Sequence, residues 1–316
     1  MTRCRLAILA LSLAVSACAA SPPVAEVRLV AKAFDDLNSA SAPLLDDLAV
    51  AERIQGRNAA ERRAQQHAGD ATPTAPGTST RCPEVTRAAA GATHVQSGFC
   101  AEDSYYYSEL SDPPGTAAFR RSLAAIGDYT HVLLILAEGR NLEVAQAQLQ
   151  SLAANVGGAL ELAGATGLGP AAGALASALQ PVLDLAAKHG NAEELARNVK
   201  EVAPQVVAVI EQLRATAPEL FTTLTEQSLA RFRRDGLVNA EIAQLESRRI
   251  ETYRVAVSNY VVLLDQYQSL LAGLVQAYDL EGKSITLAGL AERSAQLSAQ
   301  ADAWRRTFSA LRLGLN

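Results

Sequence analysis

Residues 250–278, IETYRVAVSNYVVLLDQYQSLLAGLVQAY, carry the pattern that decides the fold. Large apolar and tyrosine side chains recur here at alternating spacings of three and four residues. That spacing places them on one stripe along a helix of about four heptads, which predicts a helix buried against other helices. The stripe consists of Ile250, Tyr253, Val257, Tyr260, Leu264, Tyr267, Leu271, Leu274 and Tyr278.

A second stripe with the same spacing follows the break at Asp279–Lys283, which contains Gly282. Two such helices joined by a short turn form an antiparallel hairpin, so we predict a helical hairpin at the end of the chain. The second stripe consists of Leu287, Leu290, Ser294, Leu297, Ala301, Trp304, Phe308, Leu311 and Leu315.

A third stripe lies near the start of the chain, where Pro43 is predicted to kink or divide the helix. Alanine and leucine dominate the composition and no strand alternation is visible, which favours helix over strand. The predicted fold is therefore all-α: an elongated antiparallel helical bundle with coiled-coil-like heptad helices and one disulfide-closed loop. The third stripe consists of Val27, Val30, Phe34, Leu37, Ser41, Leu44 and Leu48.

The chain divides into four predicted segments. Residues 1–17 are expected to be a signal peptide, and residues 18–68 the new N-terminus with a first long helix. Residues 69–116 form an excursion rich in Pro and Gly, which predicts irregular structure. Residues 117–316 are expected to form the helical bundle that ends in the hairpin.

The first residues have the three-part layout of an export signal: Arg3 and Arg5, an apolar stretch over Leu6–Val15, and then small residues. The apolar stretch is too short to span a bilayer as a helix, which needs about 20 residues. An ordinary cleaved signal, with Cys18 incidental, is the alternative to a lipid-attachment signal.

Residues Val15-Ser16-Ala17-Cys18 resemble the lipobox of bacterial lipoproteins, in which an apolar and two small residues precede a cysteine. The resemblance implies cleavage before Cys18, a diacylglycerol thioether on its sulfur and an acylated amino group, without any cofactor. Since Ala19 rather than Asp follows, it further implies the periplasmic face of the outer membrane. Only residues 19–23 then precede the first helix, a reach of roughly 17 Å.

Two further cysteines, Cys82 and Cys100, would remain in the exported chain once Cys4 leaves with the signal. An even pair in an exported protein predicts a disulfide, here closing a loop of about 19 residues and stabilising by roughly 3 kcal/mol. The alternatives are two free thiols or a metal site, although only His94 lies between the cysteines and no CxxC spacing occurs.

Charge and motifs exclude several function classes. The net charge of −5 becomes −7 without Arg3 and Arg5, since 28 − 2 = 26 basic residues then face 33 acidic ones, which argues against nucleic-acid binding. No catalytic or metal motif is present beyond one Asp128-x-x-His131, whose histidine is best interpreted as half-buried in the core. We therefore expect no enzyme, no catalytic residue, no metal and no cofactor.

The tyrosines and one uncharged stretch are candidates for function. Tyr105, Tyr106 and Tyr107 follow the cysteine loop and are predicted contacts for a protein partner in the envelope, with burial against the end of the bundle as the alternative. The tyrosine stripe of the hairpin is interpreted as packing, with a stacking groove as its alternative. The expected function is that of a lipid-anchored adaptor, structural or interacting, in the cell envelope.

The second candidate is the stretch 162–183, which has no charged residue in 22 positions. It is similar in layout, although in no motif, to the apolar insertion of α-helical pore-forming toxins of the cytolysin A type. The resemblance implies a membrane-active alternative function. Each half of the stretch is short of a bilayer span, so close helix packing through small residues is the competing interpretation.

Overall fold

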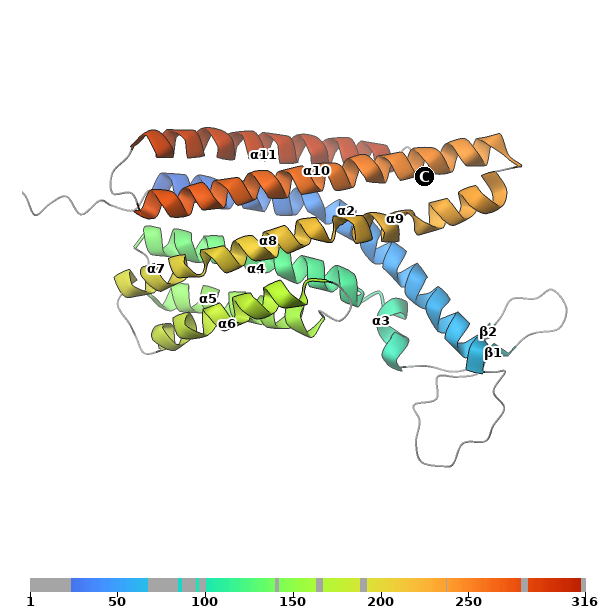
Figure 1. Ribbon diagram of the computed structural model, residues 1–316, viewed down its shortest axis with the longest axis horizontal. Helices are drawn as coiled ribbons and strands as arrows, with labels where there is room; N and C mark the ends of the chain where they lie inside the picture. The colour runs from blue at the N-terminus through green and yellow to red at the C-terminus, as the bar shows by residue number, and fades with distance from the viewer. Residues whose placement is uncertain are drawn as a thin grey trace, which may run out of the picture.

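A computed structural model describes residues 24–67, 85–86, 95–96, 101–139, 142–162, 167–187, 192–236, 238–279 and 284–313. Nearly all of these residues are helical, which confirms the all-α prediction. The helices lie side by side along one main direction, and the end of one of them projects from the rest (Figure 1).

The predicted hairpin is formed by α10 (Ala240–Asp279) and α11 (Ser284–Leu313). Tyr253 lies 6.4 Å from Phe308 between ring centroids, and Gly273 faces Leu290, so the two helices are antiparallel. Asn239 caps α10, because its side-chain oxygen accepts hydrogen bonds from two backbone N–H groups of the first turn. The buried side chains of the two stripes are Val257, Tyr260, Leu264, Tyr267, Leu271, Leu274, Leu290, Ser294, Leu297, Ala301, Trp304 and Phe308.

Helix α2 (Val24–His67) packs its stripe against α11, α4 and α10. Every residue of that stripe from Val27 to Leu48 is buried. Pro43 was predicted to kink or divide the helix, and it does not divide it, since one helix continues through this position. Ser41 and Leu44, on either side, are fully buried and hold the helix where the proline removes a backbone donor. Beyond the bundle, α2 projects away from the other long helices (Figure 1).

The remaining helices complete the bundle below α10 and α11 in Figure 1. Helices α4 and α5 pack together, and α5 and α6 form a hairpin. Helix α8 lies between these and α10, while α9 packs against α10 and α2. A π-helical turn over Phe232–Gly236 leads from α9 into α10. The bounds are α4 Pro114–Ala137, α5 Leu142–Glu161, α6 Gly169–Ala187, α7 Ala192–Glu201, α8 Ala203–Ala215 and α9 Ala217–Arg231.

The excursion 69–116 is less irregular than predicted. A two-residue strand β1 (Val85–Thr86) pairs antiparallel with β2 (Val95–Gln96), although no strand was expected. A 3-10 turn η1 (Ala101–Asp103) and the short helix α3 (Ser104–Tyr107) follow, and α4 begins at Pro114 rather than at 117 because proline suits the first turn of a helix. Cys18, Cys82 and Cys100 lie outside the described residues.

The uncharged stretch 162–183 packs its leucine and valine side chains in or against the core of the bundle. Within α6 and the turn before it, the side chains of Leu168, Leu175, Leu179 and Val182 are each at most 2% exposed. Across the described parts of the chain, no helix combines the length and apolar character that crossing a membrane requires.

Candidate interaction site at the junction of α2 and α3

The short helix α3 rests on the projecting half of α2 through Tyr106 and Gly56. A β-carbon at position 56 would lie 2.2 Å from two carbons of the Tyr106 ring, so only glycine allows the ring to lie on the helix backbone. Burial raises the pKa of Tyr106 above its ordinary value. One of the three predicted contact tyrosines is therefore a packing residue.

The other two tyrosines face outward. Tyr105 is 51% and Tyr107 44% exposed, and Leu110, just beyond α3, is 99% exposed. The guanidinium of Arg57 on α2 lies 5.9 Å from the centroid of the Tyr107 ring, within the range of a cation–π contact. We call Tyr105, Tyr107 and Leu110 the exposed tyrosine surface.

Two arginines of α2 fasten the segment that carries this surface. Arg53 donates hydrogen bonds to the carbonyl oxygens of Ser108, at 3.1 Å, and Ser111, at 3.0 Å. Arg63 forms an ion pair with Asp103, which is only 3% exposed. The exposed tyrosine surface thus stands on a segment held at both ends rather than on an untethered loop.

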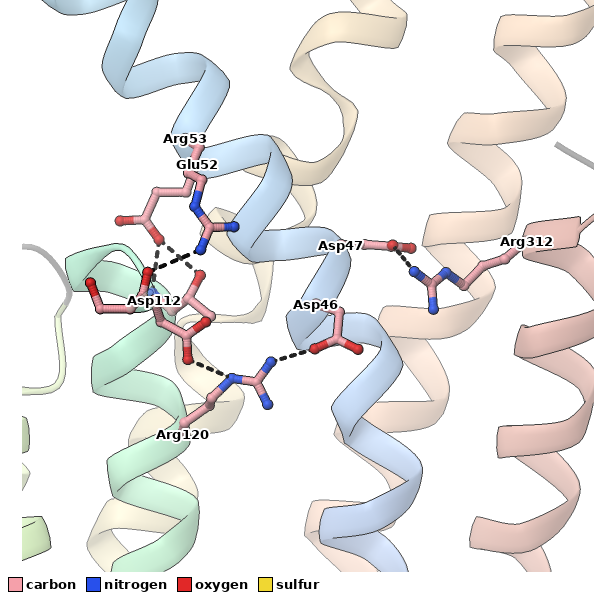
Figure 2. Close-up of polar contacts among 9 residues, drawn as sticks. Asp46, Asp47, Glu52, Arg53, Asp112, Arg120 and Arg312 are labelled. Carbon is pink, nitrogen blue, oxygen red and sulfur yellow. Dashed lines mark hydrogen bonds and ion pairs between the residues drawn. The ribbon is translucent and has the colours of Figure 1, made fainter. Parts of the chain in front are cut away.

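Glu52 of α2 caps the start of α4, as Figure 2 shows in part. Its carboxylate accepts hydrogen bonds from the backbone N–H groups of Gly115 (2.7 Å) and Thr116 (2.8 Å) and from the Thr116 hydroxyl (2.9 Å). Pro113, the residue before α4, offers no side-chain cap, so α2 supplies the negative charge that a helix N-terminus favours.

Two adjacent carboxylates of α2, Asp46 and Asp47, connect this helix to neighbouring helices on opposite sides (Figure 2). Asp46 accepts a hydrogen bond from Arg120 of α4 at 2.6 Å. Asp47 accepts one from Arg312 of α11 at 2.6 Å and one from the Tyr253 hydroxyl at 3.2 Å. Burial raises the pKa of Asp47 although Arg312 and Tyr253 both act to lower it. The helix is thereby anchored just before it leaves the bundle.

A cavity of about 460 Å³ opens beside this anchor, between α2, the start of α4 and α9. Gln55 of α2 bridges to α9, donating to the Thr223 carbonyl oxygen at 3.4 Å and to the Glu226 carboxylate. Tyr106 forms part of the wall, so the cavity adjoins the predicted contact residues. The lining is Leu48, Glu52, Gln55, Gly56, Asn58, Ala59, Arg62, Tyr106, Gly115, Phe119, Glu219, Leu220, Thr223 and Glu226.

The sequence pointed to the tyrosines, and to Leu48 as a buried residue, but to none of the polar α2 and α9 residues of this site. Gln55 and Thr223 are 168 positions apart, and no local pattern relates them. Gly56 offered the one available signal, because an isolated glycine within a helical pattern often marks a close approach of another group.

The other candidate residues take structural roles in the described chain. Tyr260 and Tyr267 are fully buried, which confirms their interpretation as packing residues. Asp128 accepts hydrogen bonds from Gln148, Ser151 and Asn155 of α5 and so joins α4 to α5. Within the described ranges, no three metal-ligating side chains converge.

In comparisons with known proteins, the chain matches no family model, no curated protein and no solved structure.

Proposed function

We propose that this protein is a lipid-anchored adaptor of the bacterial cell envelope, attached through acylated Cys18 to the periplasmic face of the outer membrane. In this proposal it binds a partner protein through the exposed tyrosine surface. The lipobox-like residues 15–18 support the anchor. The main support for the contact is that Tyr105 and Tyr107 are exposed. The segment that bears them is held against α2 by Arg53 and Arg63.

The composition of the surface supports protein binding. Tyrosine and arginine are enriched among the residues that dominate binding energy at protein interfaces, and rigid placement lowers the entropy cost of association. Tyr107 with Arg57 beside it presents both residue types together. A surface on a fastened segment loses less freedom on binding than one on an untethered loop.

The length of α2 supports a spacer role. The helix begins at Val24, six positions after Cys18, and Gly56 lies 32 positions further along it. At 1.5 Å per residue the contact surface would stand roughly 48 Å along α2 from the anchored end. We further propose that the long helices form an elongated, coiled-coil-like bundle that holds the surface away from the lipid.

The disulfide between Cys82 and Cys100 belongs to the same proposal. The register that pairs Val85 with Gln96 and Thr86 with Val95 brings together the two arms of the loop that the cysteines would close. A covalent closure next to α3 would reduce the freedom of the segment that leads into the exposed tyrosine surface.

Photocross-linking in intact cells tests the partner contact. The photoreactive residue p-benzoylphenylalanine replaces Tyr107 in one strain and Val262, which is 51% exposed on α10, in a control strain. We expect one envelope protein to be captured from position 107 and not from position 262, and mass spectrometry identifies it. Equal capture from both positions, or none from position 107, would contradict the contact.

Cell fractionation tests the anchor separately. In Cys18→Ser, we expect the mature chain to leave the membrane fraction, and to differ in electrophoretic mobility from the wild type. An unchanged fraction and mobility would contradict the lipid anchor, whatever the result of cross-linking.

The membrane-active alternative acts through the stretch 162–183. Burial of Leu168 and Leu175 in the bundle favours a packing role for that stretch, and charged substitutions there would disturb the core rather than test the activity. Dye leakage from liposomes that carry the full chain is the direct measurement. We expect the liposomes to remain intact, and leakage would favour the alternative.

A further inference from the structure

We propose that the cavity between α2 and α9 receives a basic side chain, lysine or arginine, from the partner protein. This inference rests on the proposed adaptor function and names the chemistry of its contact. It follows from the charge of the cavity, from its aromatic and apolar walls, and from its position beside the exposed tyrosine surface.

The charge of the lining is unbalanced. Three glutamates and one arginine line the cavity, which gives a formal charge of −3 + 1 = −2. In the described chain, neither Glu219 nor Glu226 has an ion-pair partner, and the hydrogen bond that Glu226 accepts comes from the neutral amide of Gln55. Arg62 is the one cation among the lining residues, and because the lining keeps a net charge of −2, a further cation brought between the two glutamates still gains attraction.

Glu52 has a different role from the two carboxylates of α9. Its oxygens are already occupied by two backbone N–H groups and a hydroxyl at the start of α4. It therefore shapes the cavity wall and adds negative charge, while Glu219 and Glu226 remain available as acceptors. These two lie on the same helix, with Thr223 between them in the wall.

The rest of the wall suits the stem of a long basic side chain. Leu48, Phe119 and Leu220 are at most 5% exposed and form the apolar part, with the ring of Tyr106 beside them. Lysine and arginine place their methylene groups on apolar surfaces and their charge against carboxylates or aromatic faces. A volume of about 460 Å³ lies within the usual range of ligand pockets and admits one such side chain.

The position of Tyr106 explains why the occupant belongs to the partner protein. Tyr106 lines the cavity, and its neighbours Tyr105 and Tyr107 are exposed outside it. A partner lying on the exposed tyrosine surface is thus adjacent to the cavity and can insert one residue into it. A free amine bound in the cavity would not need contacts with the neighbouring tyrosines.

Peptide binding to the purified full chain in detergent tests the inference. The probes are a labelled peptide Gly-Arg-Gly-Arg-Gly, its glutamate counterpart Gly-Glu-Gly-Glu-Gly, and spermidine as a free amine. The variants are Glu219→Gln with Glu226→Gln, and the control Glu292→Gln, which removes the same type of charge from an exposed position on α11. Fluorescence anisotropy gives the affinities, and circular dichroism checks that each variant folds.

We expect the wild type to bind the arginine peptide, the double variant to bind it at least tenfold more weakly, and Glu292→Gln to stay within twofold of the wild type. Equal binding by wild type and double variant, or equal binding of the glutamate peptide, overturns the inference. Spermidine that binds as tightly as the peptide with the same glutamate dependence also overturns it, in favour of a free amine.

The same double variant separates this inference from the proposed function. If it still captures the envelope partner from position 107 as the wild type does, the cavity inference fails and the adaptor function stands. If the wild type binds the arginine peptide but captures no partner, the adaptor function fails instead.

Discussion

The ring of Tyr106 in α3 lies against the backbone of Gly56 in α2, with no room for a β-carbon between them. The contact sets how far the exposed tyrosine surface stands from α2, because Tyr105 and Tyr107 flank the docked ring. Loss of the contact would release the surface without unfolding the bundle, since the α2 residues that belong to the connected hydrophobic core lie between Val27 and Leu48.

Gly56→Ala tests this contact. We expect α3 to be displaced, since an added β-carbon 2.2 Å from the ring forces the ring to move, while global stability changes by no more than about 1 kcal/mol because alanine favours the helix itself. Hydrogen exchange should quicken over residues 104–107 and remain unchanged in α10. Gly157→Ala is the matched control, because nothing lies within 4 Å of its added carbon. Unaltered exchange in α3 would contradict the docking.

Glu52→Ala tests capping of α4 by α2. The substitution leaves two backbone donors and the Thr116 hydroxyl without their acceptor, and we expect a loss of about 1–3 kcal/mol in the free energy of unfolding. Urea denaturation measures the loss. Glu61→Ala, an exposed glutamate further along α2, should cost under about 0.5 kcal/mol. Similar losses for the two variants would show that the cap contributes nothing.

The buried tyrosines of α10 give a paired prediction. Thr130 donates its proton to the Ile126 carbonyl oxygen, so the Tyr267 hydroxyl donates to Thr130, at 2.5 Å. We expect Tyr267→Phe to cost about 1 kcal/mol. The Tyr260 hydroxyl is buried without a partner among the described residues, and Tyr260→Phe should leave stability unchanged or raise it. Thermal unfolding compares the two, and a larger loss for Tyr260→Phe would contradict the assignment.

His131 introduces a small dependence of stability on pH. Its Nδ1 donates to the Gly127 carbonyl oxygen, its Nε2 lies 3.5 Å from Asp35, and the hydrogen bond and charge of Asp35 raise the pKa of His131 in the folded state. A raised histidine pKa stabilises the fold below the unfolded value of about 6.5, and this stabilisation is lost as pH rises through the folded pKa.

Urea unfolding at about pH 5.5 and about pH 8.5 measures this effect. Both side chains of the pair are more than one-third exposed, so we expect a difference of no more than about 0.5 kcal/mol between the two conditions. His131→Gln should remove that difference, while the dependence of the free energy of unfolding on pH that comes from other titratable groups remains. If the variant shows the same difference as the wild type, the pH dependence comes from groups other than His131.

Cys82 and Cys100 are expected to be disulfide-bonded in protein taken from the envelope. Alkylation without a reductant should leave both cysteines unmodified, and alkylation after reduction should modify both, as mass spectrometry reports. In the chain-entropy account, Cys82→Ser loses roughly 3 kcal/mol of the stability that the loop closure provides. Modification of both thiols without a reductant would contradict the bond.

The sequence by itself determined the helices and their buried faces. The stripes from Val27 to Leu48 and from Val257 to Leu274 were correctly predicted to be buried helix faces, because helical periodicity and the apolar pattern are local properties of the chain. The same local signals predicted the antiparallel hairpin. At Pro43 they predicted a kink or a division, and the helix is not divided there, because buried residues on both sides pack the two parts into one helix.

Only the tertiary structure decided what surrounds the tyrosines. Asp47 and Arg312 are 265 positions apart, and Glu52 caps a helix 63 positions away, so the sequence offers no periodicity from which either contact can be inferred. The cavity arises because α2 leaves the bundle beside α9, which brings Gln55 to Glu226. Such contacts depend on how helices cross, and many crossings satisfy the same pattern of apolar stripes.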